Sequence, residues 1–332
     1  MAKILVTGAN GFVGRKLCSV LQMRGCDVRA AIRCHAERNE AAVAHHDRLS
    51  VSDVVAVGDI GSDTVWSDAL KNVEVVVHLA ARVHIMQEMS KNPLESFRSV
   101  NVLGSKKLAE EAARRGIRRF VYISSISIHG NSTGERAYVE GDEAQPHSPY
   151  AVSKWEGELA LRNVAEKTGF ELVIVRPPLV YGPGVGGNFL RLMKWADKGF
   201  PLPLGRVHNL RSFIGIENLV ELLVRCVEHP RAAGETFLVA DGGDLSTPDL
   251  MRRVAKLLGR PARIVPFPVS FLRWGAKVFG QEDVLDRLCN CLQVDAGKAI
   301  RLLGWKPLMS LDEGLERTTG WYVEEYRRKK HR

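Results

Sequence analysis

Short apolar runs alternate with longer amphipathic segments along the first half of the chain. The runs have strand length and are apolar on both faces: Ile4 to Val6, Val28 to Ile32, Val54 to Val57, Val75 to Leu79, Phe120 to Ile123 and Leu172 to Val175. Segments with helical spacing of apolar residues lie between them, for example Phe12 to Arg24 and Leu94 to Arg115. This pattern is typical of parallel strands covered by helices on both sides. It predicts an α/β fold built on a doubly wound parallel sheet.

The pattern changes after Arg176, where glycine and proline interrupt it repeatedly. These residues are Pro177, Pro178, Gly182, Pro183, Gly184, Gly186, Gly187, Gly199, Pro201, Pro203 and Gly205. Such a stretch does not fit another regular βα unit. A helical pattern over Glu217 to Glu228 and a strand-like run over Thr236 to Ala240 then return the chain to the sheet. Four short helices are expected after Pro248: Leu250 to Leu258, Val269 to Phe279, Ala296 to Leu303 and Leu311 to Tyr326.

These changes predict two domains. Residues 1–180, with about 214–241, form a dinucleotide-binding domain, and about 181–213 with 242–332 form a smaller, discontinuous, mostly C-terminal substrate lobe. Ligands of doubly wound sheets bind beyond the carboxyl ends of the strands. We therefore expect the substrate between the two domains.

Composition narrows the class of protein. A chain with 45% hydrophobic and 26% charged residues can bury a large core. No apolar run approaches the roughly 18 residues of a membrane helix, and the N-terminus lacks the pattern of a signal peptide, so we expect a cytoplasmic protein without a membrane span. The six cysteines lack the spacing of a metal or redox site, which predicts no metal: Cys18, Cys26, Cys34, Cys226, Cys289 and Cys291.

The net charge of +9 is concentrated at the C-terminus. Five positive charges fall in the last six residues: Arg327, Arg328, Lys329, Lys330 and Arg332. Such a tail is typical of a solvated helix end, and binding of the tail to an acidic membrane surface is an alternative. No nucleic-acid partner is expected.

A glycine-rich segment follows the first apolar run directly. It reads Gly8-Ala9-Asn10-Gly11-Phe12-Val13-Gly14 and precedes an amphipathic helix. A glycine-rich turn between a strand and a helix lets the backbone approach a pyrophosphate, whose charge the amides at the helix N-terminus stabilise. Isolated glycine triplets are common in ordinary turns, but this position favours a dinucleotide site.

The end of the second strand indicates which dinucleotide binds. An acidic residue there would accept hydrogen bonds from the adenine ribose of NAD, but the chain has Ile32 followed by Arg33. A guanidinium pairs well with a 2′-phosphate, so NADP(H) is favoured and NAD(H) is the alternative. Arg33, His35 and Arg38 could instead form a solvated loop.

Other polar residues lie near strand ends. Asp59, followed by Ile60, ends the third run and could face the adenine amine, although an exposed turn aspartate is nearly as good an explanation. His78 and His84 flank the end of the fourth run. We interpret them as structural histidines.

Tyr150 and Lys154 are four residues apart, so on a helix they lie on one face one turn apart. A free tyrosine has a pKa of about 10, and a neighbouring ammonium stabilises the phenolate. Tyr150 could then transfer a proton while a hydride moves. Ser125, downstream of Ser124 in a serine-rich strand end, could hydrogen-bond the reacting oxygen.

Together these motifs resemble the extended short-chain dehydrogenase/reductase family, in its nucleotide-sugar epimerase/reductase branch. The resemblance runs through Thr7-Gly8 to Gly14, His78-Leu79-Ala80-Ala81, Val100-Asn101, Ser124-Ser125 to Gly130, Tyr150 to Lys154, Arg176-Pro177 to Gly184, Asn188-Phe189 and Arg211-Ser212-Phe213. It implies a Rossmann domain, a nucleotide-sugar domain and a homodimer formed through two helices of each subunit.

The resemblance also assigns site residues. Ser125, Tyr150 and Lys154 match the catalytic set, with Ser125 chosen over Ser124 by counting back from Gly130. The cofactor side matches Leu79, Ala80, Ala81, Asn101 and Pro177. The UDP-sugar side matches Asn188, Phe189, Arg211 and, with less certain alignment, Arg287.

Departures from the family pattern narrow the reaction. Dehydratases carry an acidic pair directly after the catalytic serine, where this chain has Ile126-Ser127. Epimerases of this family hold NAD with an acid at the place of Ile32. We therefore predict reduction of a UDP-4-keto-6-deoxy-N-acetylhexosamine for surface polysaccharide synthesis. A UDP-hexose or N-acetylhexosamine 4-epimerase, and a non-catalytic dinucleotide-sensing protein, are the alternatives.

Overall fold

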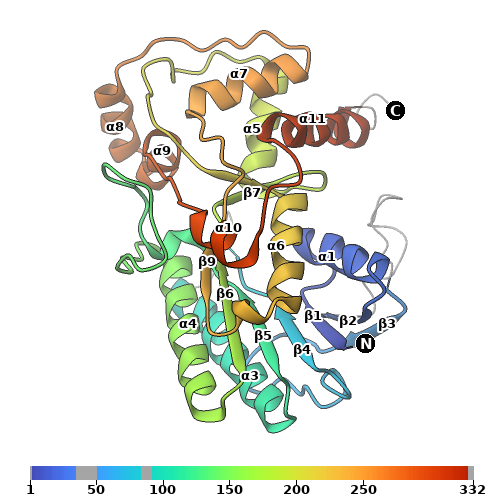
Figure 1. The fold of residues 1–332 in the computed structure, drawn as a ribbon. Coiled ribbons are helices and arrows are strands. Elements are labelled where there is room, and N and C mark those ends of the chain that lie inside the picture. Colours follow the sequence, from blue (N-terminus) through green and yellow to red (C-terminus); the bar gives the residue numbers. More distant parts are fainter. Residues whose placement is uncertain (1, 35–50, 84–91, 328–332) are drawn as a thin grey trace.

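A computed structural model describes residues 2–34, 51–83 and 92–327 (Figure 1). Seven parallel strands form the main sheet in the order β3-β2-β1-β4-β5-β6-β9. Their bounds are β1 (Lys3–Thr7), β2 (Asp27–Ile32), β3 (Asp53–Ala56), β4 (Val75–His78), β5 (Arg119–Ile123), β6 (Glu171–Arg176) and β9 (Thr236–Leu238). The predicted Rossmann-type doubly wound sheet is confirmed.

Helices cover both faces of this sheet (Figure 1). One core lies under α1 (Phe12–Met23) and α6 (Ile216–Glu228), and the other lies under α3 (Ser105–Arg114) and α4 (Pro149–Thr168). Strand β4 faces both cores. Val77 belongs to the first core and its neighbour Val76 to the second. Successive side chains point to opposite faces, so both must be apolar.

The helix predicted over Leu94 to Arg115 is interrupted. It consists of α2 (Pro93–Arg98), a π-helical turn (Ser99–Gly104) and α3. Gly104 allows the turn to pack closely, because a Cβ at this position would lie 2.5 Å from Cγ2 of Ile60. The interruption matters for the site, because it carries Asn101.

The glycine- and proline-rich stretch contains more regular structure than expected. Strands β7 (Leu179–Tyr181) and β8 (Phe213–Gly215) form a separate parallel pair, with α5 (Gly187–Lys198) between them. The expectation that no βα unit forms here was therefore wrong. The glycines lie at element ends: Gly199, for example, has a φ of 64° and ends α5.

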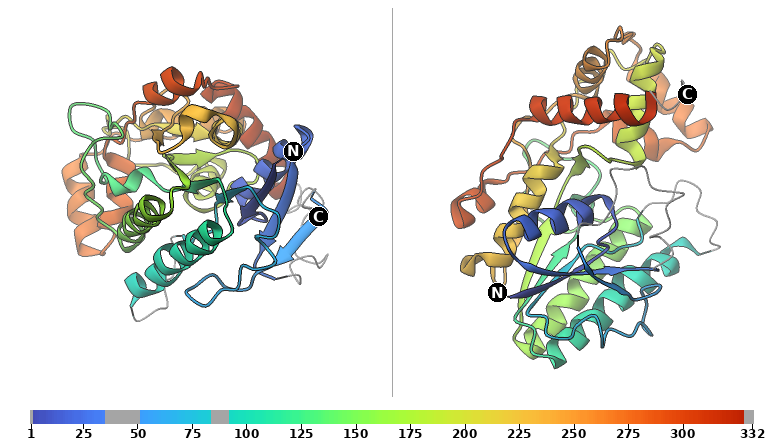
Figure 2. Two further views of the ribbon diagram at one scale, coloured as in Figure 1. Left: turned by 60° about the horizontal axis from the view of Figure 1, so that its bottom comes forward. Right: turned by 90° about the vertical axis from the view of Figure 1, so that its right-hand side faces the viewer.

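The remaining helices of the described chain are α7 (Thr247–Leu257), α8 (Val269–Val278), α9 (Glu282–Cys289), α10 (Gly297–Leu303) and α11 (Leu311–Tyr322). Helix α10 packs against β9 and contributes Ala299 and Leu303 to the first core, whereas the other four lie beyond the carboxyl end of the sheet (Figure 1). A third core joins α5, α7 and α11, and the right-hand view in Figure 2 shows α11 crossing over the end of the sheet. Helix α9 was not predicted, and α11 is shorter than expected because a π-helical turn follows at Val323–Arg327.

None of the helices in the described parts of the chain has the length and apolar character needed to cross a membrane. The predicted domain boundaries remain a prediction. The third core does show that α5, α7 and α11 bury a hydrophobic surface of their own.

Candidate active site

The glycine-rich turn joins β1 to α1 at very short range. Gly8 has a φ of 64°, and a Cβ there would lie 2.9 Å from the backbone nitrogen of Ala80. At Gly14 a Cβ would lie 2.1 Å from the carbonyl oxygen of Gly8. Side chains at these two positions would push α1 and the strand end β4 away from the turn. Glycine is required for the close packing.

The N-terminus of α1 is open toward the turn. Its N-cap is Gly11, which has no side chain to cap the helix, and no acidic residue lies in the first turn. The amides of the first helical turn thus carry the positive end of the helix dipole without a compensating charge from that turn. Asn10, Phe12 and Val13 flank this end and are half-buried. The pyrophosphate of a dinucleotide fits this arrangement.

Arg33 and Asp59 come together at the ends of neighbouring strands. Nε of Arg33 lies 3.0 Å from Oδ1 of Asp59, with the side chains 72% and 87% exposed. The two residues predicted to face the adenosine thus form an ion pair with each other. A cavity of about 640 Å³ adjoins them, lined among others by Asp59, Ile60 and Thr64.

Ile32 is a core residue of β2. His35 and Arg38 lie outside the described residues, so the alternative of a solvated loop is untested for them.

Lys154 is almost completely buried at the end of β5. Its Nζ donates to the carbonyl oxygen of Ile123 at 2.6 Å and lies 4.0 Å from the centre of the Tyr122 ring. Burial lowers the pKa of the Lys154 ammonium to about 7, although Glu158 opposes the shift. The carbonyl and the ring hold the ammonium at one point on the inner side of α4.

Tyr150 lies one helical turn before Lys154, because α4 begins at Pro149 after the N-cap Ser148. Ser125, which follows β5, lies beside Tyr150. Burial raises the pKa of the Tyr150 phenol to about 12, and hydrogen bonding to the nearby Ser125 side chain acts in the opposite direction. The structure thus brings together the three residues that the sequence analysis singled out.

The neighbours of Ser125 settle its orientation. Its Oγ accepts hydrogen bonds from the hydroxyl of Ser127 at 2.9 Å and from the Ser127 amide at 3.2 Å. Ser124 differs: its buried hydroxyl has no hydrogen-bond partner among the described residues. Ser125 is the serine placed beside Tyr150, and its catalytic role in preference to Ser124 stays a prediction.

Asn101 connects the segment after β4 to α4. It is completely buried, its Oδ1 accepts from the Arg82 amide at 2.8 Å, and its Nδ2 donates to the Arg82 carbonyl at 3.0 Å and to the Ser153 hydroxyl at 2.9 Å. These contacts give Asn101 a positioning role. Its predicted place on the cofactor side stays a prediction.

His78 is structural, as expected. Its ring nitrogens lie 2.7 Å from Oγ1 of Thr7 and 2.9 Å from Oγ of Ser105, and burial lowers its pKa to about 3. Thr7 Oγ1 also accepts from the Ala80 amide at 3.2 Å. His84 lies outside the described residues.

The other residues predicted on the cofactor side lie where strands β4 and β6 end. Leu79, Ala80 and Ala81 are half-buried directly after β4. Pro177 is buried, and its carbonyl accepts from the Ile126 amide at 3.1 Å. These residues bring the backbone of three neighbouring strand ends to one edge of the sheet.

Two arginines predicted to bind substrate lie near each other. Nη1 of Arg211 donates to the carbonyl oxygen of Asn290 at 3.0 Å. Burial lowers the pKa of Arg211 to about 10, and the positive charge of Arg287, on α9, adds to the shift. An anion placed between the two guanidiniums would relieve this repulsion.

Asn188 and Phe189, the other two residues predicted to bind substrate, lie in the first turn of α5. Asn188 is exposed in the first turn of α5, where its Oδ1 accepts from Arg191 at 2.6 Å. Phe189 is buried in the third core and stacks on Tyr181 with the ring centres 5.5 Å apart. Its ring therefore packs in the protein interior, and the predicted contact of Phe189 with the substrate stays a prediction.

Sequence reasoning missed three supporting groups. The carbonyl of Ile123 holds Lys154, Ser153 links Asn101 to the backbone of Tyr150, and the carbonyl of Asn290 holds Arg211. Two of them are backbone carbonyls, for which residue type carries no signal. Ser153 lies inside the Tyr150 to Lys154 motif and could have been considered.

Residues 4–240 match the model of the NAD dependent epimerase/dehydratase family. The chain belongs to this family. A relative from Vibrio cholerae, named UDP-glucose 4-epimerase, is 40% identical over 324 residues, which are 97% of this chain and 95% of the relative. An Escherichia coli O157:H7 relative, named N-acetyl-alpha-D-glucosaminyl-diphospho-ditrans,octacis-undecaprenol 4-epimerase, is 26% identical over 95% of this chain and 93% of the relative.

The family's solved structures agree with the fold. The crystal structure of UDP-glucuronic acid 4-epimerase from Bacillus cereus in complex with NAD has a TM-score of 0.79 at 25% identity, covering 98% of this chain and 99% of that one. Membership shows that the protein is an enzyme of the NAD-dependent epimerase/dehydratase type. These relatives are epimerases by name, which favours the predicted alternative over the reductase.

Proposed function

We propose that this enzyme is a UDP-sugar 4-epimerase that uses Ser125, Tyr150 and Lys154 at the sugar C4. The observation that carries the proposal is the cluster itself: a phenol beside Ser125, one turn from a buried ammonium, beyond the carboxyl end of β5. The identity of 40% to a UDP-glucose 4-epimerase over nearly the whole chain supports the same reaction.

The chain's own groups would move the proton. A dinucleotide held by the turn from Gly8 to Gly14 would supply reversible hydride transfer at C4 of the sugar. Tyr150 would remove the proton from the 4-hydroxyl and give it back, while Ser125 holds the oxygen. With its pKa raised to about 12, Tyr150 is protonated in the free protein at neutral pH. The phenolate must therefore form in the complex, where positive charge from Lys154 and from the oxidised dinucleotide stabilises it.

The surroundings of Ser125 argue against dehydration. The position after it is Ile126, a core residue, and the next is Ser127, whose hydroxyl is bonded to Ser125. Neither can take a proton from C5 or expel water at C6. Reduction of a 4-keto sugar uses the same three residues, so it is the second candidate and must be separated by experiment.

Arg211 and Arg287 would bind the diphosphate of the substrate. Asn188 and the backbone of Phe189, which are neighbours in the first turn of α5, would contribute to the same substrate site. The charge repulsion between the two arginines, together with the burial of Arg211, supports this assignment. The guanidinium groups of these two arginines match phosphate oxygens but do not recognise uridine. A sugar diphosphate linked to a polyprenol, as in the name of the Escherichia coli relative, would satisfy the same pair.

The proposed cofactor is a dinucleotide on Gly8 to Gly14 with its adenosine near Arg33 and Asp59. Arg33 favours the 2′-phosphate of NADP(H), but its ion pair with Asp59 offsets part of that charge. The Bacillus cereus structure contains NAD, which supports NAD(H). Fluorescence titration of wild type and of Arg33→Ala with both reduced cofactors decides between them: a preference for NADPH that Arg33→Ala abolishes supports Arg33 as the phosphate ligand.

We extend the proposal to the domains and the assembly. Residues 1–180 with about 214–241 would hold the cofactor, and about 181–213 with 242–332 would hold the substrate, in a cytoplasmic homodimer. Leu103 and Leu159, on the π-helical turn and on α4, are 49% and 47% exposed and would be covered in such a dimer.

Two incubations test the reaction. In the first, purified protein receives UDP-glucose or UDP-N-acetylglucosamine without added cofactor, and we expect the galacto epimer. In the second, it receives UDP-4-keto-6-deoxy-N-acetylglucosamine with NADPH, and we expect no loss of NADPH absorbance. Tyr150→Phe is the matched control in both. Stoichiometric loss of NADPH with formation of a 6-deoxy sugar nucleotide, and no epimer in the first tube, would replace the epimerase by the reductase.

A further inference from the structure

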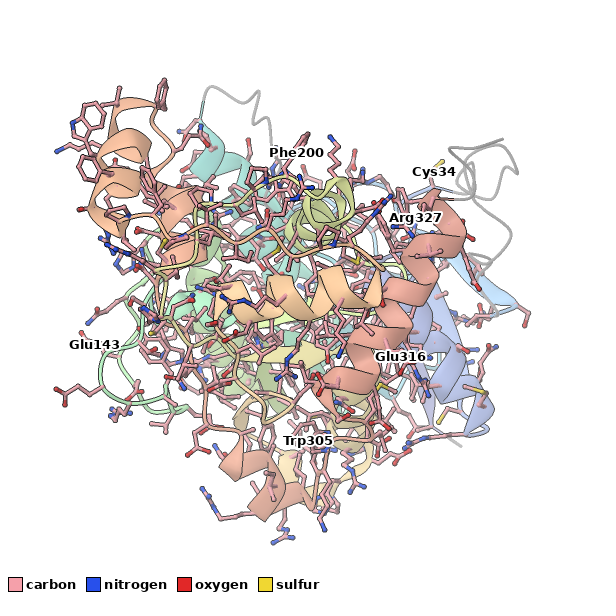
Figure 3. The ribbon with its side chains drawn as sticks, turned by 90° about the horizontal axis from the view of Figure 1, so that it is seen from above. Cys34, Glu143, Phe200, Trp305, Glu316 and Arg327 are labelled. Carbon is pink, nitrogen blue, oxygen red and sulfur yellow. The ribbon has the colours of Figure 1, made fainter. Side chains whose placement is uncertain are left out.

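Helix α8 presents an apolar stripe to solvent. Phe271, Trp274 and Val278 are 63%, 70% and 60% exposed and are spaced so that they share one side of the helix. Phe279 continues the stripe at 79% exposure, and Phe267 precedes it with its ring 6.2 Å from that of Phe271. No residue of α8 is buried. Figure 3 shows α8 and α9 at one corner of the molecule, with side chains projecting away from its body.

The same region is strongly basic. Residues 250–281 contain no acidic residue, and their basic residues are Arg252, Arg253, Lys256, Arg260, Arg263, Arg273 and Lys277. Arg252, Arg253 and Arg260 form ion pairs with acidic residues elsewhere. Arg263, Arg273 and Lys277 are exposed and form no ion pair with any described residue. Arg273 and Lys277 therefore flank the apolar stripe without a direct ion-pair partner, and the nearest acidic residues in sequence are Glu282, Asp283 and Asp286 on α9.

We propose that this face of α8 docks onto the surface of an anionic membrane. Aromatic side chains are favourable at the headgroup level, and lysine or arginine beside them pairs with lipid phosphates while its stem stays apolar. Each basic residue near such a surface adds to the electrostatic attraction. The short helix, about 15 Å long, offers far less than the roughly 800 Å² per partner of a stable protein interface. That size argues against a second copy of the chain as the occupant.

The position of α8 gives the docking a consequence for the active site. Helix α9 begins at Glu282, shortly after α8 ends, packs against α8 and carries Arg287. Arg287 in turn lies near Arg211. Docking through α8 would therefore place the proposed diphosphate-binding end of the site close to the membrane surface. The docking itself goes beyond the proposed epimerase function and does not depend on it.

Flotation of the purified full-length protein with lipid vesicles tests the proposal. We expect binding to vesicles of phosphatidylcholine with phosphatidylglycerol, weak binding to phosphatidylcholine alone, and loss of binding at high salt. Phe271→Ser with Trp274→Ser should lower the partition coefficient at least about tenfold, because two aromatic side chains no longer leave water. Arg273→Gln with Lys277→Gln should remove the preference for the anionic vesicles.

The control replaces equally exposed apolar residues elsewhere. Met23→Ser with Val65→Ser alters side chains that are 75% and 72% exposed on the sheet domain, and we expect wild-type partitioning. Turnover of a UDP-sugar is measured on all variants in solution, so that failure of the epimerase proposal is distinguished from failure of docking. Absence of wild-type binding to anionic vesicles, or equal loss in the control variant, would overturn the proposal. So would dimer dissociation, seen by light scattering, in the α8 variant.

Discussion

Lys154, which is buried, and Tyr150, which is half-buried, have pKa values displaced in opposite directions. Burial brings the pKa of Lys154 down to about 7 and that of Tyr150 up to about 12. Above neutral pH the free protein therefore holds both groups largely uncharged. This arrangement keeps Tyr150 from acting as a base before substrate and cofactor are bound, because a phenolate without a nearby cation is unfavourable in a buried site.

Substitution of Tyr150 tests its role. We expect Tyr150→Phe to lower kcat by about 10² to 10⁴-fold, the range of acid–base catalysis, because only the transferable proton is lost. Cofactor affinity should stay within a few-fold of wild type, since the ring still packs on Phe97 with the centres 6.0 Å apart. Steady-state kinetics and a cofactor titration give the two values. More than half the wild-type rate in the variant would contradict the assignment.

The burial of His78 predicts that the folded protein becomes less stable as the pH falls. Its pKa is about 3 in the folded protein because burial, assisted by the Lys154 charge, disfavours the imidazolium. The unfolded chain, with a histidine pKa of about 6.5, binds the proton more readily. The contribution of neutral His78 to the free energy of unfolding is therefore complete above pH 6.5 and is lost as the pH falls toward 3.

Between pH 7 and pH 5 this site alone should lower the free energy of unfolding by about 2 kcal/mol. Urea unfolding at the two pH values measures the change. His78→Asn, which keeps a neutral polar group between Thr7 and Ser105, should show a smaller change by about that amount. An identical acid loss in both proteins would mean that His78 is not the responsible group.

At the scale of elements, the sequence determines the sheet more clearly than the parts around it. Strands such as Val75–His78 are apolar on both faces because helices cover both, so a short run is sufficient evidence. The helix before α4 could not be divided from its pattern, since the π-helical turn depends on how Gly104 packs against Ile60. Helix α9 was missed although Val284, Leu285 and Leu288 repeat at helical spacing, because it is only eight residues long and buries none of them.

The site shows the same contrast. Ser125, Tyr150 and Lys154 were predictable because the residue types and their spacing carry the chemistry. The burial of the Phe189 ring could not be predicted, because its packing against Tyr181 depends on the third core. Asn101 was found from its motif, but only its contacts show that it positions the segment after β4.

The turn between β1 and α1 gives a prediction at this scale. Gly14→Ala should destabilise the protein by about 1 to 3 kcal/mol, because its Cβ would lie 2.1 Å from the Gly8 carbonyl oxygen, and it should weaken cofactor binding as α1 shifts. Gly320→Ala on α11 is the matched control, since nothing lies within 4 Å of its Cβ. The control should be neutral or stabilising by up to about 1 kcal/mol. Thermal unfolding and cofactor titration decide; equal behaviour of the two variants would refute the packing argument.

In the whole molecule, the candidate site combines early and late parts of the chain. The turn after β1 and the start of α4 come from the first half, whereas Arg211 and Arg287 come from the segments beyond the sheet. A buried network connects β7, β8 and α6 to the segment after β9: the Tyr181 hydroxyl donates to Asp241 at 2.7 Å, and Asp241 also accepts from the Gly215 amide and from Asn218. Polar contacts therefore help to hold the separate strand pair next to the end of the last strand of the main sheet.

The proposed homodimer belongs to this scale as well. Leu159 is 47% exposed on α4 and Leu103 is 49% exposed on the π-helical turn, and these two segments pack against each other. A lysine at position 159 would have to be buried in a dimer formed there, and an unpaired buried charge is strongly unfavourable. We expect Leu159→Lys to be monomeric by light scattering at concentrations where wild type is dimeric. Leu308→Lys, at a residue 65% exposed outside any helix, should leave the dimer intact. A dimeric Leu159→Lys, or a wild type that stays monomeric at all concentrations, would show that these two segments do not form the interface.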